Sequence, residues 1–143
     1  MIVLDTNVIS EMLRVVPSPH VARWIAAQPE HELYITAVTE AEIRVGVNMM
    51  PTGKRKAQLQ ATVDQIISRV FAGQILSFDS ACAAVYAEIS ANRRSIGKPI
   101  SPFNAQITAI ARAKSLYERP VCLDRFAAGT DFLSAACAYI GHK

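Results

Sequence analysis

The sequence predicts an α/β fold built on a parallel sheet of four or more strands, with helices flanking both faces of the sheet. Short apolar runs alternate along the chain with longer segments in which apolar residues recur at helical spacing. Such alternation is typical of parallel strands joined by helical crossovers. The strand candidates, each bounded by polar or turn residues, are Ile2 to Leu4, Leu33 to Ile35, Ile75 to Phe78, and Val121 to Leu123.

Helix start and stop signals fall in the segments between these strands. Ser18-Pro19 and Ser101-Pro102 each place a capping hydroxyl before a first-turn proline. Asp79 can cap a helix that runs to Arg94, and Gly97-Lys98-Pro99 ends that helix. These signals support helices in the places where crossovers are needed.

The composition describes one folded domain over residues 1–143, since 51% of the residues are hydrophobic and 19% are charged. The net charge of +3 permits binding to a polyanion without requiring it. Three widely spaced cysteines, Cys82, Cys122 and Cys137, predict neither a disulfide framework nor a zinc site. With no targeting segment and no apolar run of membrane-spanning length, we expect a cytoplasmic protein without a membrane partner.

Asp5 follows the first predicted strand, and ligands of parallel sheets bind beyond the carboxyl ends of the strands. Taken alone, an aspartate after a strand more often caps a helix, here one that begins near Val8. Whether other acids lie near Asp5 decides between ligand binding and helix capping as its role.

Glu42 is the second candidate acid, in a helix that follows the second strand. Helical spacing places it on a stripe with Val38, Val45 and Met49, where a carboxylate is costly unless it is paired or bound to a metal. Thr39-x-x-Glu42 also satisfies a capping box, which is the structural alternative.

Asp124 directly follows the fourth predicted strand, and strand polarity places it at the same sheet edge as Asp5. Carboxylates crowded at one edge repel each other unless a cation neutralises them. An oxygen-only cluster without Cys or His favours Mg²⁺ or Mn²⁺ over zinc.

Three motifs carry a family resemblance: Val3-Leu4-Asp5-Thr6-Asn7, the segment from Thr39 to Gly46, and the segment from Ile100 to Ile107. With these motifs in order and correctly spaced, the chain resembles PIN-domain toxins of the VapC and FitB type. The resemblance implies a PIN domain with Mg²⁺- or Mn²⁺-dependent endoribonuclease activity. It further implies a homodimer, an antitoxin partner, and contact with operator DNA only through the antitoxin.

The resemblance maps a four-acid catalytic site onto Asp5, Glu42, position 104 and an acid after the last strand, with Thr6 nearby. Position 104, an aspartate in the family, is asparagine here. Its side-chain oxygen can still ligate a metal but brings no charge, so metal affinity should fall. The chain is therefore expected to be either an impaired nuclease or a deliberately inactivated one.

The last acid has two candidates, because the sequence after Leu123 departs from the family pattern. Asp124 is preferred since it follows the strand directly, while Asp131 precedes Phe132 in a family-like pair. The expected metal ligands are then Asp5, Asn104 and Asp124.

For the reaction, we expect the cation to polarise the scissile phosphate and activate a water, with Glu42 orienting that water or completing the ion shell. A 5′-phosphate product is implied by the resemblance. Thr6 is expected to contact the RNA. So are Lys54, Arg55 and Lys56, in a basic segment over residues 50–56 that is predicted to be an exposed loop.

Two other functions remain open. A PIN-fold binding module with weak catalysis would act through an antitoxin and operator DNA, and Asn104 supports it. A phosphotransferase with Asp5 as its nucleophile is disfavoured, because Asn7 stands where such enzymes carry a second aspartate.

Overall fold

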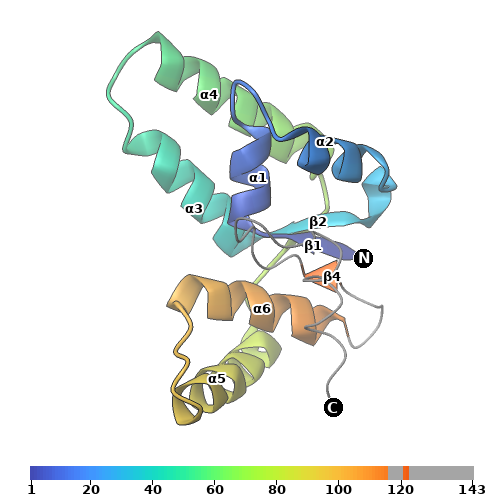
Figure 1. The fold of residues 1–143 in the computed structure, drawn as a ribbon, viewed down its shortest axis with the longest axis vertical. Coiled ribbons are helices and arrows are strands. Elements are labelled where there is room, and N and C mark those ends of the chain that lie inside the picture. Colours follow the sequence, from blue (N-terminus) through green and yellow to red (C-terminus); the bar gives the residue numbers. More distant parts are fainter. Residues whose placement is uncertain (116–120, 123–143) are drawn as a thin grey trace.

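The computed structural model of the chain describes residues 1–115 and 121–122 (Figure 1). Its elements in chain order are β1 (Ile2–Leu4), α1 (Thr6–Met12), α2 (Pro19–Ala26), the 3-10 turn η1 (Glu30–Glu32), β2 (Leu33–Thr36), α3 (Ala37–Asn48), α4 (Lys54–Gln65), the π-helical turn η2 (Ile66–Val70), β3 (Ile75–Leu76), α5 (Ser80–Ser95), α6 (Pro102–Lys114) and β4 (Val121–Cys122). In the described part of the chain, no helix is long and apolar enough to cross a membrane.

The four strands form one parallel sheet in the order β3-β2-β1-β4. Figure 1 shows α1, α2 and α4 on one side of the sheet and α5 and α6 on the other. The α/β class, the parallel sheet and the helical cover of both faces are therefore as the sequence predicted. Because the chain moves outward from β1 to β3 and then returns to the other side of β1, the sheet changes winding direction beside β1.

The third strand is shorter than predicted, since Ser77 and Phe78 lie outside it. The Ser77 carbonyl accepts a contact from the Cys82 thiol at 3.8 Å, and the Phe78 ring packs edge-on against Tyr86 with ring centroids 6.1 Å apart. Cys82 and Tyr86 both belong to α5, so Ser77 and Phe78 contact that helix and are no longer part of the sheet. In the fourth strand, Val121 and Cys122 are as predicted, and Leu123 lies outside the described residues.

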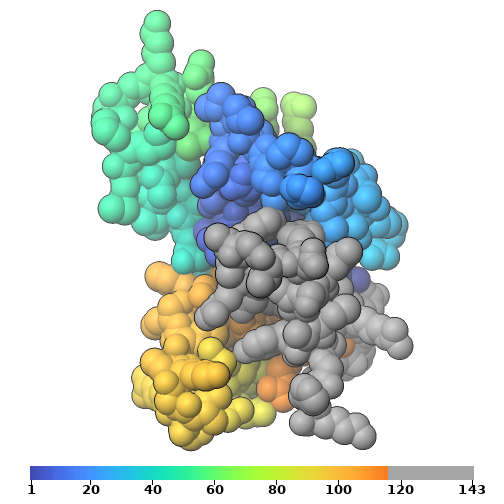
Figure 2. Space-filling model, in the orientation of Figure 1, coloured from blue at the N-terminus to red at the C-terminus, as the bar shows by residue number. Residues whose placement is uncertain are grey.

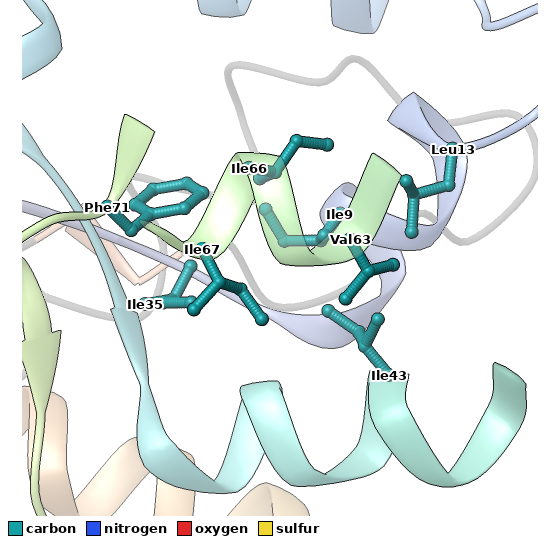
Figure 3. Close-up of a pocket in the computed structure, with 8 residues that line it drawn as sticks. All are labelled: Ile9, Leu13, Ile35, Ile43, Val63, Ile66, Ile67 and Phe71. Carbon is teal, nitrogen blue, oxygen red and sulfur yellow. The ribbon is translucent and has the colours of Figure 1, made fainter. Parts of the chain in front are cut away.

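The hydrophobic core lies between the sheet and the helices α1, α3 and α4. Every residue of β1 is buried, as expected for a central parallel strand. Figure 3 shows side chains of α1, β2, α3, α4 and η2 converging on one apolar cavity, with Phe71 at its margin; they are Ile9, Leu13, Ile35, Ile43, Val63, Ile66 and Ile67. Trp24 packs against the same cluster. The apolar faces of α1 and α4 thus serve mainly as core, although Val70 is exposed.

The predicted helix signals are largely confirmed. Asp79 Oδ1 accepts from the Cys82 amide at 3.0 Å, and Ser101 Oγ accepts from the Asn104 amide at 3.2 Å. At the start of α2, Ser18 is the N-cap residue but makes no side-chain capping bond. Gly97 ends α5 with φ of +69°, a conformation that favours glycine.

Candidate active site

Asp5 lies at the carboxyl end of β1, where it is only 5% exposed. Its backbone is extended, and Oδ1 accepts from the Val8 amide at 2.9 Å, so it is the N-cap of α1. Oδ2 lies 3.4 Å from Asn7 Nδ2, which donates to it. The capping interpretation is therefore confirmed. It does not exclude metal binding, because an ionised carboxylate has about four acceptor sites.

Glu42 is held beside this strand end by Thr6. The Thr6 hydroxyl donates to Glu42 Oε2 at 2.5 Å and so joins the first turn of α1 to the middle of α3. Since Thr6 is the chain neighbour of Asp5, the bond brings a second carboxylate to the carboxyl end of β1. The Thr6–Glu42 hydrogen bond, which holds Glu42 beside the neighbour of Asp5, is the central geometric feature of the site.

The capping box predicted for Glu42 is wrong. Thr36 caps α3 instead: its Oγ1 accepts from the Thr39 amide at 3.0 Å and lies 3.0 Å from the Thr39 hydroxyl. Thr39 is already inside the helix and fully buried. Glu42 is therefore not needed to begin α3, which removes the structural alternative for this residue.

The apolar stripe assigned to Glu42 is not a buried face. Val45 is 55% exposed and Met49 is 81% exposed, whereas the buried face of α3 carries Thr39, Ile43 and Val47. Glu42 is half-buried. The carboxylate has a hydrogen-bond partner, as expected, and this partner is the Thr6 hydroxyl on α1.

Asn104 lies in the first turn of α6, which packs against α3. Its backbone amide donates to Ser101 Oγ, and its carbonyl accepts from the Thr108 hydroxyl at 2.7 Å. The residue itself is exposed. Figure 1 shows the beginning of α6 on the same side of the molecule as the beginnings of α1 and α3. The three helices that carry Asp5, Glu42 and Asn104 therefore start in one region.

Asp124 and Asp131 both lie outside the described residues. The described part of β4 ends at Cys122, which pairs with Val3 in the parallel β1–β4 ladder.

Asp79, another acid that follows a strand, is directed away from this region. Its Oδ2 accepts from Lys114 Nζ at 2.5 Å, at the far end of α6 from Asn104. The ten residues between Asn104 and Lys114 correspond to roughly 15 Å of helix. Hydrogen bonds from Lys114 and the Cys82 amide hold the pKa of Asp79 far below its usual range. Asp79 therefore does not replace the acid missing at position 104.

The described residues of the candidate site offer the type of ligand atom that a hard cation prefers, but they carry fewer negative charges than a four-acid site. Asp5, Glu42 and the Asn104 amide offer oxygen ligands, which suit Mg²⁺ or Mn²⁺. Within residues 1–115 and 121–122, no group of three His, Cys, Asp or Glu side chains is placed to hold a metal ion.

The basic segment predicted to be a loop is in part helical, because α4 begins at Lys54. Lys56 Nζ donates to the Asn48 carbonyl at 2.6 Å and to the Met50 carbonyl at 3.3 Å, so this side chain caps the end of α3. Lys54 and Arg55 are exposed. Figure 2 shows the connection between α3 and α4 as a projecting tip, away from the start of α3.

A contact missed by sequence reasoning joins α3 to α4. Arg44 donates to Glu40 Oε1, four residues before it on α3, at 2.8 Å and also to Asp64 Oδ1 at 2.7 Å. The hydrogen bonds that Arg44 donates to these two carboxylates raise the pKa of its guanidinium. Helical spacing signals the first partner but gives no signal for the second, which lies on another helix.

Comparison with known proteins identifies the architecture. The PIN-domain family profile matches residues 2–117. The chain is 44% identical over 113 residues to the plasmid stability protein StbB of Pseudomonas syringae pv. tomato, covering 79% of this chain and 81% of that protein. It is 42% identical over 116 residues to the toxin FitB of Neisseria gonorrhoeae, covering 81% and 84%. It is 41% identical over 113 residues to the VapC ribonuclease Y4jK of Sinorhizobium fredii, covering 79% and 81%.

Among solved structures, one of FitAB bound to an IR36 DNA fragment superposes with a TM-score of 0.80 at 38% identity. The match covers 94% of this chain and 90% of that one. The similarity therefore extends to the whole arrangement of sheet and helices.

Proposed function

The chain belongs to the PIN-domain family, among the toxins of toxin–antitoxin systems, and on this premise we propose that it is a metal-dependent endoribonuclease impaired at Asn104. The observation that carries the proposal is the Thr6–Glu42 hydrogen bond, which brings a second carboxylate to the strand end where Asp5 lies. A relative that is a VapC ribonuclease supports the reaction class, hydrolysis of RNA phosphodiesters.

In this proposal Asp5, Asn104 and Asp124 hold Mg²⁺ or Mn²⁺, which when bound polarises the scissile phosphate and lowers the pKa of a water. The Val8 amide fixes one oxygen of Asp5, so the carboxylate is held in one orientation before substrate arrives. The Thr6 hydroxyl occupies Oε2 of Glu42 and leaves Oε1 to accept a proton from the attacking water. Thr6 is thereby a positioning residue for Glu42 as well as a neighbour of the RNA.

Asn104 is the weak point of the site. Its amide oxygen can ligate a cation but carries no negative charge, so the cation is held by fewer charges than in a four-acid site. We expect weaker metal binding and slower hydrolysis than an aspartate would give. The same behaviour is expected whether the asparagine at position 104 is natural or was introduced to inactivate the protein.

For partners, we propose an antitoxin protein, contact with operator DNA through that antitoxin, and a homodimer. The antitoxin partner and the contact with operator DNA are supported by the similarity of this chain to a chain in the structure of FitAB bound to a DNA fragment. An RNA substrate also implies action in the cytoplasm.

The alternative function is a catalytically weak binding module that acts only within an antitoxin complex. Asn104 favours it, because the described carboxylates of the site number two, Asp5 and Glu42, and the third matched position is neutral. In that case restoring a charge at position 104 changes nothing measurable in RNA cleavage.

Cleavage of single-stranded RNA separates the two functions. The unaltered chain, Asn104→Asp and Asn104→Asp with Asp5→Asn would be compared in Mg²⁺ and in Mn²⁺. Asparagine at position 5 keeps the cap to Val8 while removing the charge. The matched control is Asn92→Asp, the same exchange at an exposed position of α5.

We expect Asn104→Asp to cleave at least about tenfold faster than the unaltered chain, and Asp5→Asn to abolish that gain. Asn92→Asp should behave as the unaltered chain does. If Asn104→Asp, folded and supplied with Mn²⁺, cleaves no RNA, the nuclease proposal fails and the binding module stands.

A further inference from the structure

Phe103 is an exposed aromatic side chain immediately beside the proposed site. It lies in the first turn of α6, one residue before Asn104, and is 53% exposed. The inner face of the same helix is closed, with Ile107 at 3% and Ile110 at 0% exposure. Phe103 precedes Ile107 by four residues and Ile110 by seven, so it continues the line of this face into the first turn of α6, where its ring is exposed and contributes little to the core.

Single exposed apolar residues are common on protein surfaces and need no explanation by themselves. The surroundings of Phe103 make it unusual. The chain from Arg93 to Phe103 contains Arg94 and Lys98, both exposed, and no acidic residue. Ile96, in the same stretch, is 56% exposed.

The structure keeps this stretch at the surface. Gly97, with φ of +69°, ends α5, and its amide donates to the Arg94 carbonyl at 3.0 Å. The Lys98 amide donates to the Arg93 carbonyl at 2.9 Å, which folds the chain back tightly. In Figures 1 and 2, the connection from α5 to α6 forms an exposed corner that leads to the first turn of α6.

We propose that Phe103 stacks on a nucleobase of single-stranded RNA next to the scissile phosphate, while Arg94 and Lys98 bind phosphates further along the same strand. An aromatic platform interleaved with cations is the arrangement that single-stranded nucleic acids require, since the ring binds a base face and the cations bind the backbone. The inference rests on the proposed ribonuclease function, because it takes RNA as the ligand at this edge of the site.

The charge of the stretch favours RNA over a protein surface as the ligand. An interface with a second copy of this chain would place two exposed cations, Arg94 and Lys98, against a chain whose net charge is itself +3. A polyanion instead gains from both of them. Position also favours RNA, since Phe103 is the chain neighbour of a residue matched to the catalytic cluster.

Binding without cleavage tests the inference. The affinity of a short, fluorescently labelled single-stranded RNA would be measured in the presence of a chelator, which prevents hydrolysis. The variants are Phe103→Leu, which keeps an apolar side chain but removes the ring, and Phe103→Trp, which keeps a ring. The matched control is Phe78→Leu, the same exchange at another exposed phenylalanine, near the opposite end of α6.

We expect Phe103→Leu to weaken RNA binding by about tenfold, equivalent to about 1.4 kcal/mol, while Phe103→Trp and Phe78→Leu bind as the unaltered chain does. Tryptophan at position 103 should lose fluorescence on adding RNA, and an RNA with a single abasic nucleotide at the stacked position should abolish the difference between phenylalanine and leucine. Arg94→Gln and Lys98→Gln should each reduce the salt dependence of binding.

Equal affinity for RNA in Phe103→Leu and the unaltered chain overturns the inference, as does the absence of RNA binding altogether. A fall in molar mass by light scattering in Phe103→Leu, with RNA affinity unchanged, overturns it in favour of a protein interface. If RNA binding depends on Phe103 but Asn104→Asp cleaves no RNA, the nuclease proposal fails and the stacking role of Phe103 stands. The failure of one proposal is therefore distinguishable from the failure of the other.

Discussion

Replacing Thr6 by valine removes the hydroxyl that joins α1 to α3 while keeping a side chain of similar shape. The hydroxyl donates to a carboxylate at 2.5 Å, and hydrogen bonds to charged groups contribute about 1.5–3 kcal/mol. Because Thr6 and Glu42 are both half-buried, water can partly replace the lost donor, and the lower end applies. We expect a loss of about 1.5 kcal/mol of unfolding free energy and a fall in Tm of about 5 °C.

Chemical and thermal denaturation of the unaltered chain, Thr6→Val and Thr6→Ser would measure this loss, with Thr6→Ser retaining the donor. Thr62→Val is the matched control, since the Thr62 hydroxyl donates only to the Gln58 carbonyl of its own helix. It should change the unfolding free energy by less than about 0.5 kcal/mol. Combining Thr6→Val with Glu42→Gln gives a double-mutant cycle, in which a coupling energy of about 1 kcal/mol is expected.

In the Asn104→Asp background, the same exchange is expected to slow RNA cleavage by at least about tenfold, because Glu42 loses its fixed orientation. Thr6→Ser should restore most of the rate. If Thr6→Val unfolds like the unaltered chain, and its effect simply adds to that of Glu42→Gln, then the hydroxyl does not position the carboxylate and the central geometric claim is refuted.

Three further outcomes are expected. The fold lowers the pKa of Asp79, so this residue contributes stability that is present above its unfolded pKa of about 3.9 and is lost as the pH falls toward the folded pKa. Asp79→Asn should therefore unfold at a lower urea concentration than the unaltered chain at pH 7. This difference in stability should shrink in strong acid. A Lys114→Met variant that is as stable as the unaltered chain at pH 7 would contradict that pairing. Lys56→Met should lower the unfolding free energy by about 1 kcal/mol through the lost α3 cap, and unchanged stability would return Lys56 to a role in RNA binding alone. Mn²⁺ should bind Asn104→Asp at least about tenfold more tightly than the unaltered chain by calorimetry; equal affinities would show that position 104 is not a ligand.

The strands and caps were predictable from the sequence because their signals are local. The buried run Ile2 to Leu4 needs no knowledge of its neighbours to be assigned as a strand. Asp79 and Ser101 cap helices through amides three residues ahead, so the type of residue and its spacing suffice. The acids at strand ends were found by the same local rule.

The predictions that failed depend on which neighbour a helix meets. Periodicity defined the stripe with Glu42, Val45 and Met49 correctly but did not reveal that α1 and α4 cover a different face of α3. Thr36 and Thr39 are both suitable caps, and only the strand end at Thr36 decides between them. The start of α4 was missed because Gly53 supplies no side-chain cap and the first turn carries cations, against the usual charge preference.

The parallel pairing of β1 with β4 has a consequence for the order in which the protein is made. β1 leaves the ribosome before every other strand of this sheet, yet one of its two edges is completed only when Val121 and Cys122 have followed. A nascent or truncated chain that ends before β4 carries Asp5 on a strand with an open edge, and such an edge is prone to wrong pairing. The strand end that bears Asp5 therefore gains its second neighbouring strand only after Val121 and Cys122 have been added, and a chain that ends before β4 lacks this pairing.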